Sequence, residues 1–461
     1  MSFDRIILFP YYLSLKLRDR YYSSARRKIF SPSVPSVCVG NVTAGGTGKT
    51  PFVEMVLRLL QESPRWQYSQ LAVLSRGYKR ESKGFQQVTV GGSSLMFGDE
   101  PLQIKKKFPA VTVAVDKNRV EACKFLCDPE SLQSSSKKAA QCWDSNFPKA
   151  DFIVLDDAFQ YRKLRADLSV VLVNSLRPVN KDCLLPLGRL RDLKERIYSA
   201  DVIVVTKCSP DMDDEAKRAF AASLSLMNYD PGTCTCYAIA SGAGSGSAAD
   251  SASGSAGSAG SGASAGTAAG GASGPSARPA LRPLKLFFAT IAYLPLERAF
   301  PSTEPRYVYS KKAILLSGIA NDTALKNYLS DTYKIVSRLR FPDHHKYEWS
   351  DINRLQSILR KNPTASIITT EKDVQRLLDF KGMPAEIMER CFYVPIETRF
   401  VSAHEQSIFS SLLATLSRPT PALWPFDQAP SPVISTERFL LSFRASPLSF
   451  RERSEWRNLL P

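Results

Sequence analysis

The stretch VGNVTAGGTGKTPF, residues 39–52, governs the interpretation of the whole chain. It is close to the phosphate-binding pattern G-x-x-x-x-G-K-[ST]: Gly48, Lys49 and Thr50 form its end, and Thr43 stands where the first glycine is usual. A strand that passes through a glycine-rich turn into a helix presents backbone N–H groups to an anion, and the helix dipole favours negative charge there. The stretch therefore predicts a nucleotide site. A plain glycine turn that caps a helix is the alternative.

Each part of this loop has an expected task. Gly45, Gly46 and Gly48 allow the backbone to approach phosphate oxygens closely. Lys49 is expected to contact the β- and γ-phosphates, and the Thr50 hydroxyl is expected to bind Mg²⁺. The predicted nucleotide-binding residues are Thr43, Ala44, Gly45, Gly46, Thr47, Gly48, Lys49 and Thr50.

A second apolar strand, FIVLDD at residues 152–157, ends in two carboxylates. Mg²⁺ prefers oxygen ligands, so Asp156 or Asp157 is expected to hold it directly or through water. The alternative is that these carboxylates cap the next helix. The stretch TKCS, residues 206–209, begins like the guanine-reading element [NT]-K-x-D but has Ser209 in place of the aspartate. The expected nucleotide is therefore ATP.

Outside these motifs, short apolar runs alternate with helical patterns. Nearly continuous Val, Ile and Leu indicates strands of a parallel sheet with helices on both faces. These runs are residues 36–40, 70–77, 110–115, 151–157, 168–173 and 201–207. We predict an α/β fold: a P-loop NTPase-like core with a mostly parallel sheet flanked by helices, a second smaller α/β lobe and an N-terminal membrane-interface helix.

The length of 461 residues is enough for two or three domains. The Ser/Lys-rich interval 128–149 is expected to be a loop insertion, and the Ser/Gly/Ala-rich stretch to be a flexible, disordered insert. The predicted divisions are a basic N-terminal segment (1–31), the P-loop core (32–240), the insert (241–277), the smaller lobe (278–416) and a Pro-rich tail (417–461).

The net charge of +17 favours polyanionic partners. In residues 1–31 seven Lys/Arg face two Asp, and the apolar run 6–17 is too short to span a bilayer. The segment is expected to lie in the interface of an anionic membrane, or else to be an ordinary first helix packed on the core. A nucleic-acid partner would rest on charge alone, without a recognition helix or an aromatic RNA-binding strand, and is not expected.

Eight motifs follow one another along the chain: VGNVTAGGTGKTP, LSRGYKR (74–80), GDEP (98–101), DDAFQYRKLRADLSVVLV (156–173), LLPLGRLRD (184–192), LSGIAND (316–322), FPDHHKY (341–347) and TEKDVQRL (370–377). In this order they resemble the tetraacyldisaccharide 4′-kinases of lipid A biosynthesis. The resemblance also accounts for Thr43, because the loop of that family reads G-N-x-T-x-G-G-x-G-K-T-P.

This resemblance implies ATP-dependent phosphorylation of the 4′-hydroxyl of a membrane-embedded tetraacyl glucosamine disaccharide 1-phosphate, which gives lipid IVA. It also implies a peripheral location at the cytoplasmic face of the bacterial inner membrane, with a second lobe that closes over the nucleotide. No obligate protein partner is inferred.

The resemblance also assigns roles to single residues. Asp99 in GDEP matches the family's catalytic carboxylate and His344 in DHH matches its partner; with Lys49 they form the expected catalytic set. A positioned carboxylate can take the proton of a sugar hydroxyl, and a hydrogen-bonded histidine can orient it. Considered without the resemblance, Asp99 could be a turn residue before Pro101 and His344 a surface histidine.

Several further positions fall in or beside the matched motifs. Gln160 is expected to contact substrate or nucleotide, and the expected ligands of substrate phosphate are Arg76, Arg119 and Arg191, since a guanidinium matches phosphate oxygens. Residues 371–373 are interpreted as structural, with nucleotide contact as the alternative. The chain departs from the family pattern at three positions, Ala158, Tyr161 and Asp192. The resemblance therefore assigns no role to these residues.

A membrane-associated P-loop NTPase switch, which transfers no phosphate to a lipid, is the rival hypothesis. It would use the same loop, carboxylates and N-terminus. The GDEP and DHH motifs favour the kinase, because a switch does not need them.

Overall fold

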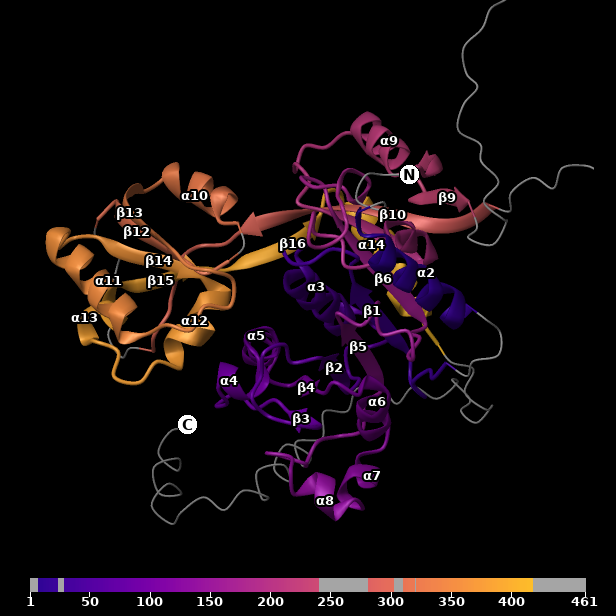
Figure 1. The fold of residues 1–461 in the computed structure, drawn as a ribbon, viewed down its shortest axis with the longest axis horizontal. Helices are drawn as coiled ribbons and strands as arrows, with labels where there is room; N and C mark the ends of the chain where they lie inside the picture. Colours follow the sequence, from indigo (N-terminus) through magenta and orange to yellow (C-terminus); the bar gives the residue numbers. More distant parts are fainter. Residues whose placement is uncertain (1–6, 24–28, 240–280, 302–309, 320, 418–461) are drawn as a thin grey trace, which may run out of the picture. The chain divides into compact units, whose positions relative to one another are not determined.

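Two β-sheets organise the chain in the computed structural model, which describes residues 7–23, 29–239, 281–301, 310–319 and 321–417. The larger sheet is mostly parallel (Figure 1). Its strands, in spatial order, are β3 (Gln86–Gln87), β4 (Thr112–Val115), β2 (Leu71–Ser75), β5 (Phe152–Asp156), β1 (Ser36–Gly40), β6 (Leu168–Asn174), β7 (Val202–Thr206), β10 (Leu281–Tyr293), β9 (Thr235–Ile239) and β8 (Met227–Asp230), with β16 (Ile396–Phe400) beside β10.

The smaller sheet has the order β11 (Glu297–Arg298), β15 (Cys391–Val394), β14 (Ser366–Thr370), β12 (Lys312–Ser317) and β13 (Lys334–Arg340). Its helices are α10 (Thr323–Ser330), α11 (Trp349–Lys361), α12 (Glu371–Leu378) and α13 (Ala385–Arg390). The helices of the remaining part are α2 (Phe9–Ser23), α3 (Lys49–Glu62), α4 (Ser94–Phe97), α5 (Asp99–Lys107), α6 (Arg119–Cys127), α7 (Pro129–Gln133), α8 (Ser136–Ala139), α9 (Asp214–Ser223) and α14 (Ala403–Thr415), with 3₁₀ turns at η1 (Val179–Lys181) and η2 (Lys194–Ser199).

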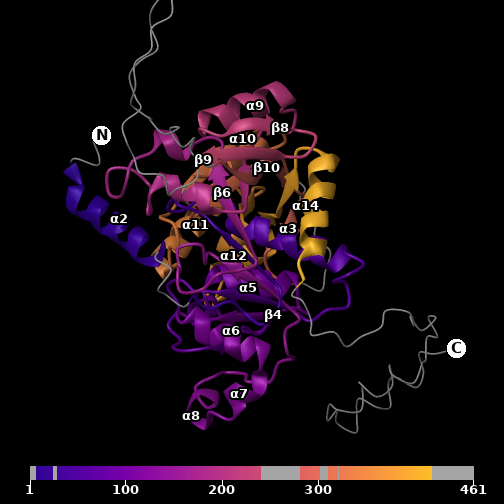
Figure 2. The ribbon, with the colours of Figure 1, turned by 90° about the vertical axis from the view of Figure 1, so that its right-hand side faces the viewer.

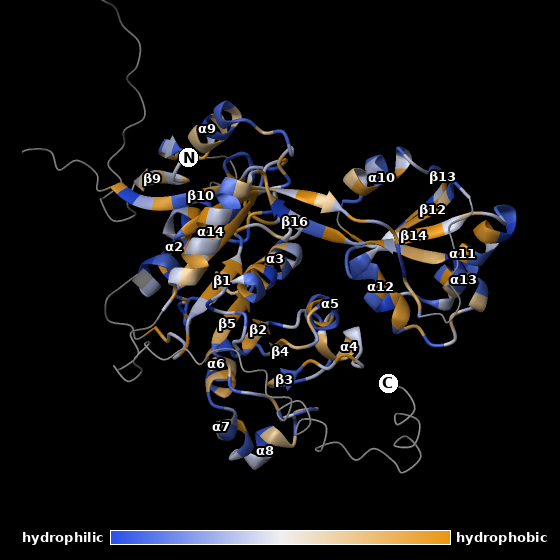
Figure 3. Cartoon of the chain, turned by 180° about the vertical axis from the view of Figure 1, so that it is seen from behind, coloured by the Kyte–Doolittle hydropathy of each residue, from blue (hydrophilic) through white to orange (hydrophobic). Residues whose placement is uncertain are grey.

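Alternate residues of each central strand enter different cores, as the pleat of a strand requires. Val37 and Val39 of β1 pack under α3, α5 and α14, whereas Cys38 faces α6 on the other side of the sheet. Figure 2 shows α3 and α14 side by side on the first of these faces. Figure 3 shows the strands β1 and β5 in hydrophobic colours between more polar helices. Burial on both faces explains the continuous Val/Ile/Leu runs, and the predicted α/β fold class is confirmed.

One strand, β10, differs from the predicted division at residue 278. It is 13 residues long and pairs with β7 through Lys285–Phe288, so it belongs to the larger sheet. Its second half, Ala289–Tyr293, pairs with β16, and α14 follows β16 back onto the core. Pairing with a strand distant in sequence decides which sheet β10 joins, and no local pattern in its sequence shows this.

The remaining sequence expectations have mixed outcomes. The interval 128–149, expected to be a loop, contains the short helices α7 and α8. In the described part of the chain no helix has the length and apolar character needed to cross a membrane. The insert 241–277 and, beyond Ser417, the C-terminal tail lie outside the described residues, as do residues 1–6 and 24–28 of the N-terminal segment.

Helix α2 is tied to the core by charge and by apolar packing. Asp192 is fully buried and accepts hydrogen bonds from Arg18 at 3.2 Å and from Arg162 at 3.3 Å. Leu15 of α2 is buried in the same cluster as Leu190. The opposite side of the helix keeps apolar side chains exposed at a spacing of four residues, namely Phe9, Leu13 and Leu17.

Candidate active site

The glycine-rich loop lies between the carboxyl end of β1 and the first turn of α3, as predicted. Gly45, Gly46 and Gly48 have φ angles of 69°, 69° and 78°, in the left-handed region that favours glycine. The loop is fixed from both sides: Thr47 accepts a hydrogen bond from Asn41 Nδ2 at 2.7 Å, and its carbonyl accepts one from the Thr206 hydroxyl at 2.9 Å. These two hydrogen bonds attach the loop to the ends of β1 and β7.

Space for a ligand lies next to the loop backbone. A Cβ atom built on Gly45 or Gly46 would meet no atom within 4 Å, so the space beside these residues is open. Glycine is favoured there by the positive φ angles and not by close packing. Lys49 and Thr50 start α3, where the helix dipole adds positive potential. These features suit a phosphate chain, although the roles of single residues stay predictions.

The two carboxylates after β5 have different environments. Asp156 is buried, and its Oδ2 accepts a hydrogen bond from the Ser75 hydroxyl at 2.9 Å, while Oδ1 has no partner within the described residues. Burial, together with the charges of Glu100 and Asp157, raises the pKa of Asp156 to about 7. A buried carboxylate oxygen without a donor fits a cation such as Mg²⁺, which would remove this destabilisation.

Asp157 carries compensating cations instead. Arg191 donates to both of its carboxylate oxygens, and Lys49 Nζ lies 3.9 Å from Oδ1. Burial opposes ionisation of Asp157, but the charges of Lys49 and Arg191 lower its pKa. Asp156 is therefore the better candidate for direct metal contact, and Asp157 orients the lysine and the arginine.

The predicted phosphate-binding arginines fall into two groups. Arg191 is directed at the nucleotide loop, because it also donates to Asn41 Oδ1 at 2.6 Å. Arg119 is buried and donates to the Asp157 carbonyl at 3.0 Å, and burial and the nearby charge of Arg76 lower its pKa. Arg76 itself is exposed.

Two neighbouring positions are also defined. Gln160 is 3.5 Å from the Asn41 carbonyl, which places it at the same loop. Tyr161, a departure from the family pattern, lies under the Arg119 guanidinium at 5.2 Å and donates to Asn118 at 3.3 Å.

Asp99 and His344 are 245 residues apart in sequence and in contact in the structure. The His344 Nδ1 atom lies 3.0 Å from Asp99 Oδ2. Asp99 is at the first position of α5, and His344 has a φ of 61°, an uncommon value for a residue other than glycine. Burial would raise the pKa of Asp99, but the His344 hydrogen bond and the charge of Lys372 lower it well below its ordinary value.

Two cations that were not predicted as site residues complete this cluster. Arg376 donates to Asp99 Oδ2 through Nε at 3.0 Å and through Nη2 at 2.5 Å. Lys372 donates to Glu100 at 3.1 Å and lies 3.2 Å from His344 Nε2. Their spacing of four residues places both on one face of α12. The sequence shows this spacing, but it does not show that this face of α12 packs against α5.

The two clusters are linked electrostatically through α5. Glu100 follows Asp99 on α5 and contributes to the raised pKa of Asp156 on β5. Glu100, the neighbour of Asp99, is therefore close enough to the candidate metal ligand for electrostatic interaction. Such an arrangement can bind a polyphosphate and a metal ion on one side and deprotonate a hydroxyl on the other.

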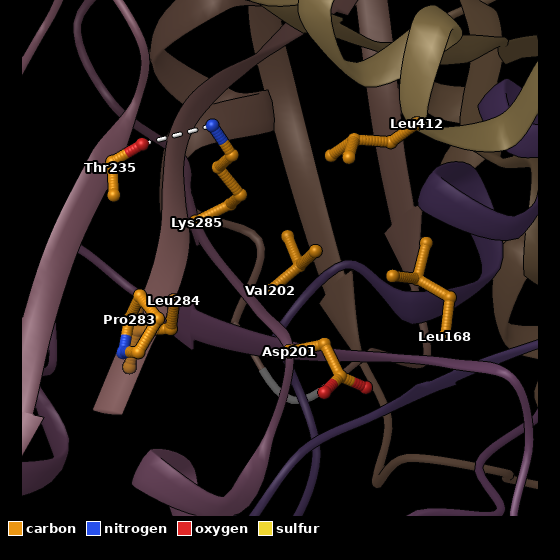
Figure 4. A pocket seen from close by; sticks show the side chains of 8 residues that line it. All are labelled: Leu168, Asp201, Val202, Thr235, Pro283, Leu284, Lys285 and Leu412. Atoms are coloured by element: carbon orange, nitrogen blue, oxygen red, sulfur yellow. Dashed lines mark hydrogen bonds between the residues drawn. The ribbon is translucent and has the colours of Figure 1, made fainter. Parts of the chain in front are cut away.

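A separate apolar pocket of about 230 Å³ is not part of this site (Figure 4). It is lined by Leu168 and Val202, which begin β6 and β7, and by Leu412 of α14. Because these strands are parallel to β1, the pocket lies at the opposite edge of the sheet from the glycine-rich loop. Lys285, at its border, is already bound to Thr235.

Comparisons with known proteins identify relatives of this chain. The family model of tetraacyldisaccharide-1-P 4′-kinase matches residues 5–417. The chain is 32% identical over 407 residues to the tetraacyldisaccharide 4′-kinase of Porphyromonas gingivalis, covering 87% of this chain and 93% of that one. It is 30% identical over 418 residues to that of Flavobacterium johnsoniae, with 90% and 97% covered. The fold is similar to the crystal structure of LpxK from Aquifex aeolicus in complex with ATP, with a TM-score of 0.54 and 21% identity over 89% of this chain and 98% of that chain.

Proposed function

The chain belongs to the tetraacyldisaccharide-1-P 4′-kinase family, and we propose that its site transfers the γ-phosphoryl group of ATP to the 4′-hydroxyl of a tetraacyl disaccharide 1-phosphate, giving lipid IVA. The observation that carries the proposal is the contact of Asp99 with His344, which brings the GDEP and DHH motifs together. A nucleotide switch has no use for a hydroxyl-directed carboxylate of this kind.

The nucleotide side is built from the loop amides, Lys49 and Asp156. Lys49 and the open backbone at Gly45 and Gly46 would hold the phosphates, and Thr50 and Asp156 would hold Mg²⁺. Bound Mg²⁺ would neutralise charge that develops on the transferred group. Lys49 is kept near Asp157, so its ammonium group is positioned before the substrate arrives.

On the acceptor side, Asp99 orients and deprotonates the hydroxyl. The O–H bond of the sugar breaks and its proton passes to the carboxylate, while the sugar oxygen bonds to the γ-phosphorus. The bond to the bridging oxygen of ADP breaks, and its electron pair stays with ADP. Because the pKa of Asp99 is low, the group is ionised at neutral pH and accepts the proton late, as suits a loose transition state.

Cations near the loop suit the anionic part of the acceptor. Arg76 is exposed beside Arg119, and neither guanidinium forms an ion pair with a carboxylate in the described residues. A guanidinium pair with free N–H groups favours a phosphate, so we assign these two arginines to the 1-phosphate of the lipid. Arg191, already bound to Asp157, serves the nucleotide side.

The exposed face of α2 is proposed to lie in the anionic surface of the inner membrane, at its cytoplasmic side. Phe9, Leu13 and Leu17 are exposed on it. A nearby loop between η1 and η2 also exposes Leu185 and Leu187, and buries Leu184 and Leu190 in the cluster that α2 covers. Apolar side chains with flanking Lys and Arg are typical of interfacial anchors.

Vesicle binding tests this location. The double variant Leu13→Glu/Leu17→Glu should lose most of its cosedimentation with vesicles that contain an anionic lipid, because charge on this face opposes insertion. Tyr68→Glu, at an exposed position after α3, is the matched control and should bind as the wild type does. Equal binding of all three proteins would contradict a membrane role for α2.

Transfer itself is tested with labelled ATP and the tetraacyl disaccharide 1-phosphate, followed by separation of the lipid products. Asp99→Ala should lower transfer by about 10²–10⁴-fold, the usual range for a general base, with ATP binding kept. Turnover of ATP at the same rate without lipid would favour the switch, and near-normal transfer by Asp99→Ala would remove this residue from the mechanism.

A further inference from the structure

The cluster around Asp99 contains two basic residues, Arg376 and Lys372, whose contacts fix the orientation of Asp99 and His344. In the described residues three donors reach the carboxylate, and all three converge on one oxygen, Oδ2: Arg376 Nε, Arg376 Nη2 and His344 Nδ1. In the described residues no hydrogen bond reaches Oδ1 of Asp99. One oxygen is thus held by three donors, and the other is left for the hydroxyl that must lose its proton.

The guanidinium group that makes two of these contacts is itself fixed. Arg376 Nη1 donates to Asp373 Oδ1 at 2.9 Å and to the Gly318 carbonyl at 3.3 Å. Asp373 is held in turn by the Gly318 N–H at 2.9 Å and by the Thr370 hydroxyl at 2.6 Å. The side chain is buried, so its orientation is set before any substrate binds.

Lys372 acts on the imidazole in a comparable way. An ammonium group only donates hydrogen bonds, so at 3.2 Å from His344 Nε2 it requires a lone pair on that nitrogen. The proton of the neutral ring is then on Nδ1, where it is donated to Asp99. Asp343 also lies near Nε2, at 3.7 Å, beyond hydrogen-bond distance, and itself accepts from Lys372 at 3.4 Å.

We propose that Arg376 and Lys372 are positioning residues for the transfer reaction: Arg376 fixes the Asp99 carboxylate by Oδ2 so that Oδ1 faces the acceptor hydroxyl, and Lys372 fixes His344 in the tautomer that donates from Nδ1. This inference rests on the proposed function, in which Asp99 accepts the proton. It replaces the purely structural interpretation of residues 371–373 for Lys372, while Asp373 keeps a structural role.

The pH dependence of kcat distinguishes a positioning role of Arg376 from a purely structural role in packing α12 against α5. The groups that face Asp99 are His344, Lys372 and Arg376. Lys372 also donates to Glu100 and Asp343, and Arg376 also pairs with Asp373. The uncharged ring of Tyr78 packs against His344. In the wild type these cations keep Asp99 ionised across the assay range. Without Arg376 one of the charges that lower the pKa of Asp99 is lost, so the acid limb of the kcat profile should move to higher pH than in the wild type.

The kinetic test compares Arg376→Met, Arg376→Lys and Lys372→Met with Arg390→Met, whose arginine makes only a partly exposed pair with Glu386. Arg376→Met should lower kcat by about 10²-fold, leave the KM for ATP within about threefold and move the acid limb to higher pH. Arg376→Lys should recover part of kcat, and Arg390→Met should match the wild type. A loss confined to KM, or an unchanged pH dependence of kcat, would overturn the proposal.

A spectroscopic arm does not depend on turnover. The chain has three histidines, so ¹⁵N-labelled imidazoles can be assigned one by one. His344 should show the Nδ1–H neutral tautomer in the wild type and lose it in Lys372→Met, even if Arg376→Met fails to fold. An Nε2–H tautomer in the wild type would refute the role of Lys372. An inactive wild type with the expected tautomer would instead refute the proposed function.

Discussion

Replacing Lys107 by methionine should weaken the junction between α3, α5 and α12, because this side chain bridges two buried carboxylates. Its Nζ lies 2.8 Å from Glu54 Oε2 and 2.6 Å from Glu371 Oε1. Glu54 is fully buried and accepts a second hydrogen bond from Gln103 at 2.8 Å. The variant would remove the ammonium group that both carboxylates contact.

The size of the effect follows from that burial. Removing one partner of a buried ion pair costs about 3–5 kcal/mol, and the partial exposure of Lys107 places the expected loss near 3 kcal/mol at pH 8. At roughly 2 °C per kcal/mol for a chain of this size, the melting temperature should fall by about 6 °C. Near pH 5.5, where Glu371 is protonated, the loss should be smaller, because a neutral carboxyl loses only a hydrogen bond to Lys107.

The pH dependence has a defined sign. Burial and the charge of Glu54 raise the pKa of Glu371 from 4.5 to about 7, against the opposing charge of Lys107. A group with a raised pKa in the folded state contributes its stability fully below pH 4.5 and loses it as the pH rises through 7. Methionine at position 107 removes the opposing charge, so the destabilisation must grow from pH 5.5 to pH 8.

Thermal melts of wild type, Lys107→Met and Lys106→Met at pH 5.5 and 8 provide the measurement. Lys106 is the neighbouring lysine of α5 and, within the described residues, makes no ion pair with a carboxylate, so its replacement should be nearly silent. Adding Glu371→Gln to Lys107→Met should restore much of the loss at pH 8. A loss of equal size at both pH values, or no recovery in the double variant, would refute the argument.

Three further perturbations test other parts of the site. Asp156→Asn should raise the Mg²⁺ concentration needed for half-maximal turnover by at least about tenfold, because an amide is a weaker ligand; an unchanged Mg²⁺ requirement would contradict the metal assignment. Gly48→Ala should cost about 1 kcal/mol, since φ is 78° there, and should raise the KM for ATP; wild-type melting and ATP kinetics would show that the loop relaxes without strain. Asp192→Ala should free Arg18, while Arg162 keeps its hydrogen bond to Asp19 of α2, and should make α2 more sensitive to protease at temperatures where the core stays folded; equal cleavage rates would show that the contacts of Asp192 do not hold the helix.

The parts that the sequence predicted are those governed by local pattern. The alternation of apolar runs and helices gave the parallel sheet, because strands buried on both faces must be continuously apolar. The glycine-rich loop was readable because left-handed φ angles at positions such as Gly48 restrict the residue type. Asp99 and His344 were paired through the family motifs, since no local rule joins residues 245 positions apart.

The parts that the sequence did not predict depend on which surfaces meet. Arg376 follows Lys372 at helical spacing, but nothing in that pattern says that α12 packs against the start of α5. Arg191, expected at the substrate, is bound to Asp157 and Asn41 on the nucleotide side, because the loop that carries it returns to β1. Pairing between distant strands likewise placed β10 in the larger sheet.

The position of β10 and β16 has a consequence for biosynthesis. In the chain, the strands of the smaller sheet, from β11 to β15, are inserted between β10 and β16 of the larger one. Phe400 and Phe409 pack against Phe52, and the Trp66 indole donates to the Leu413 carbonyl. This face of the larger sheet therefore stays uncovered on the ribosome until nearly all of the described chain has been synthesised. The inserted unit can therefore fold to completion first, while its host waits for the last strand and helix to close.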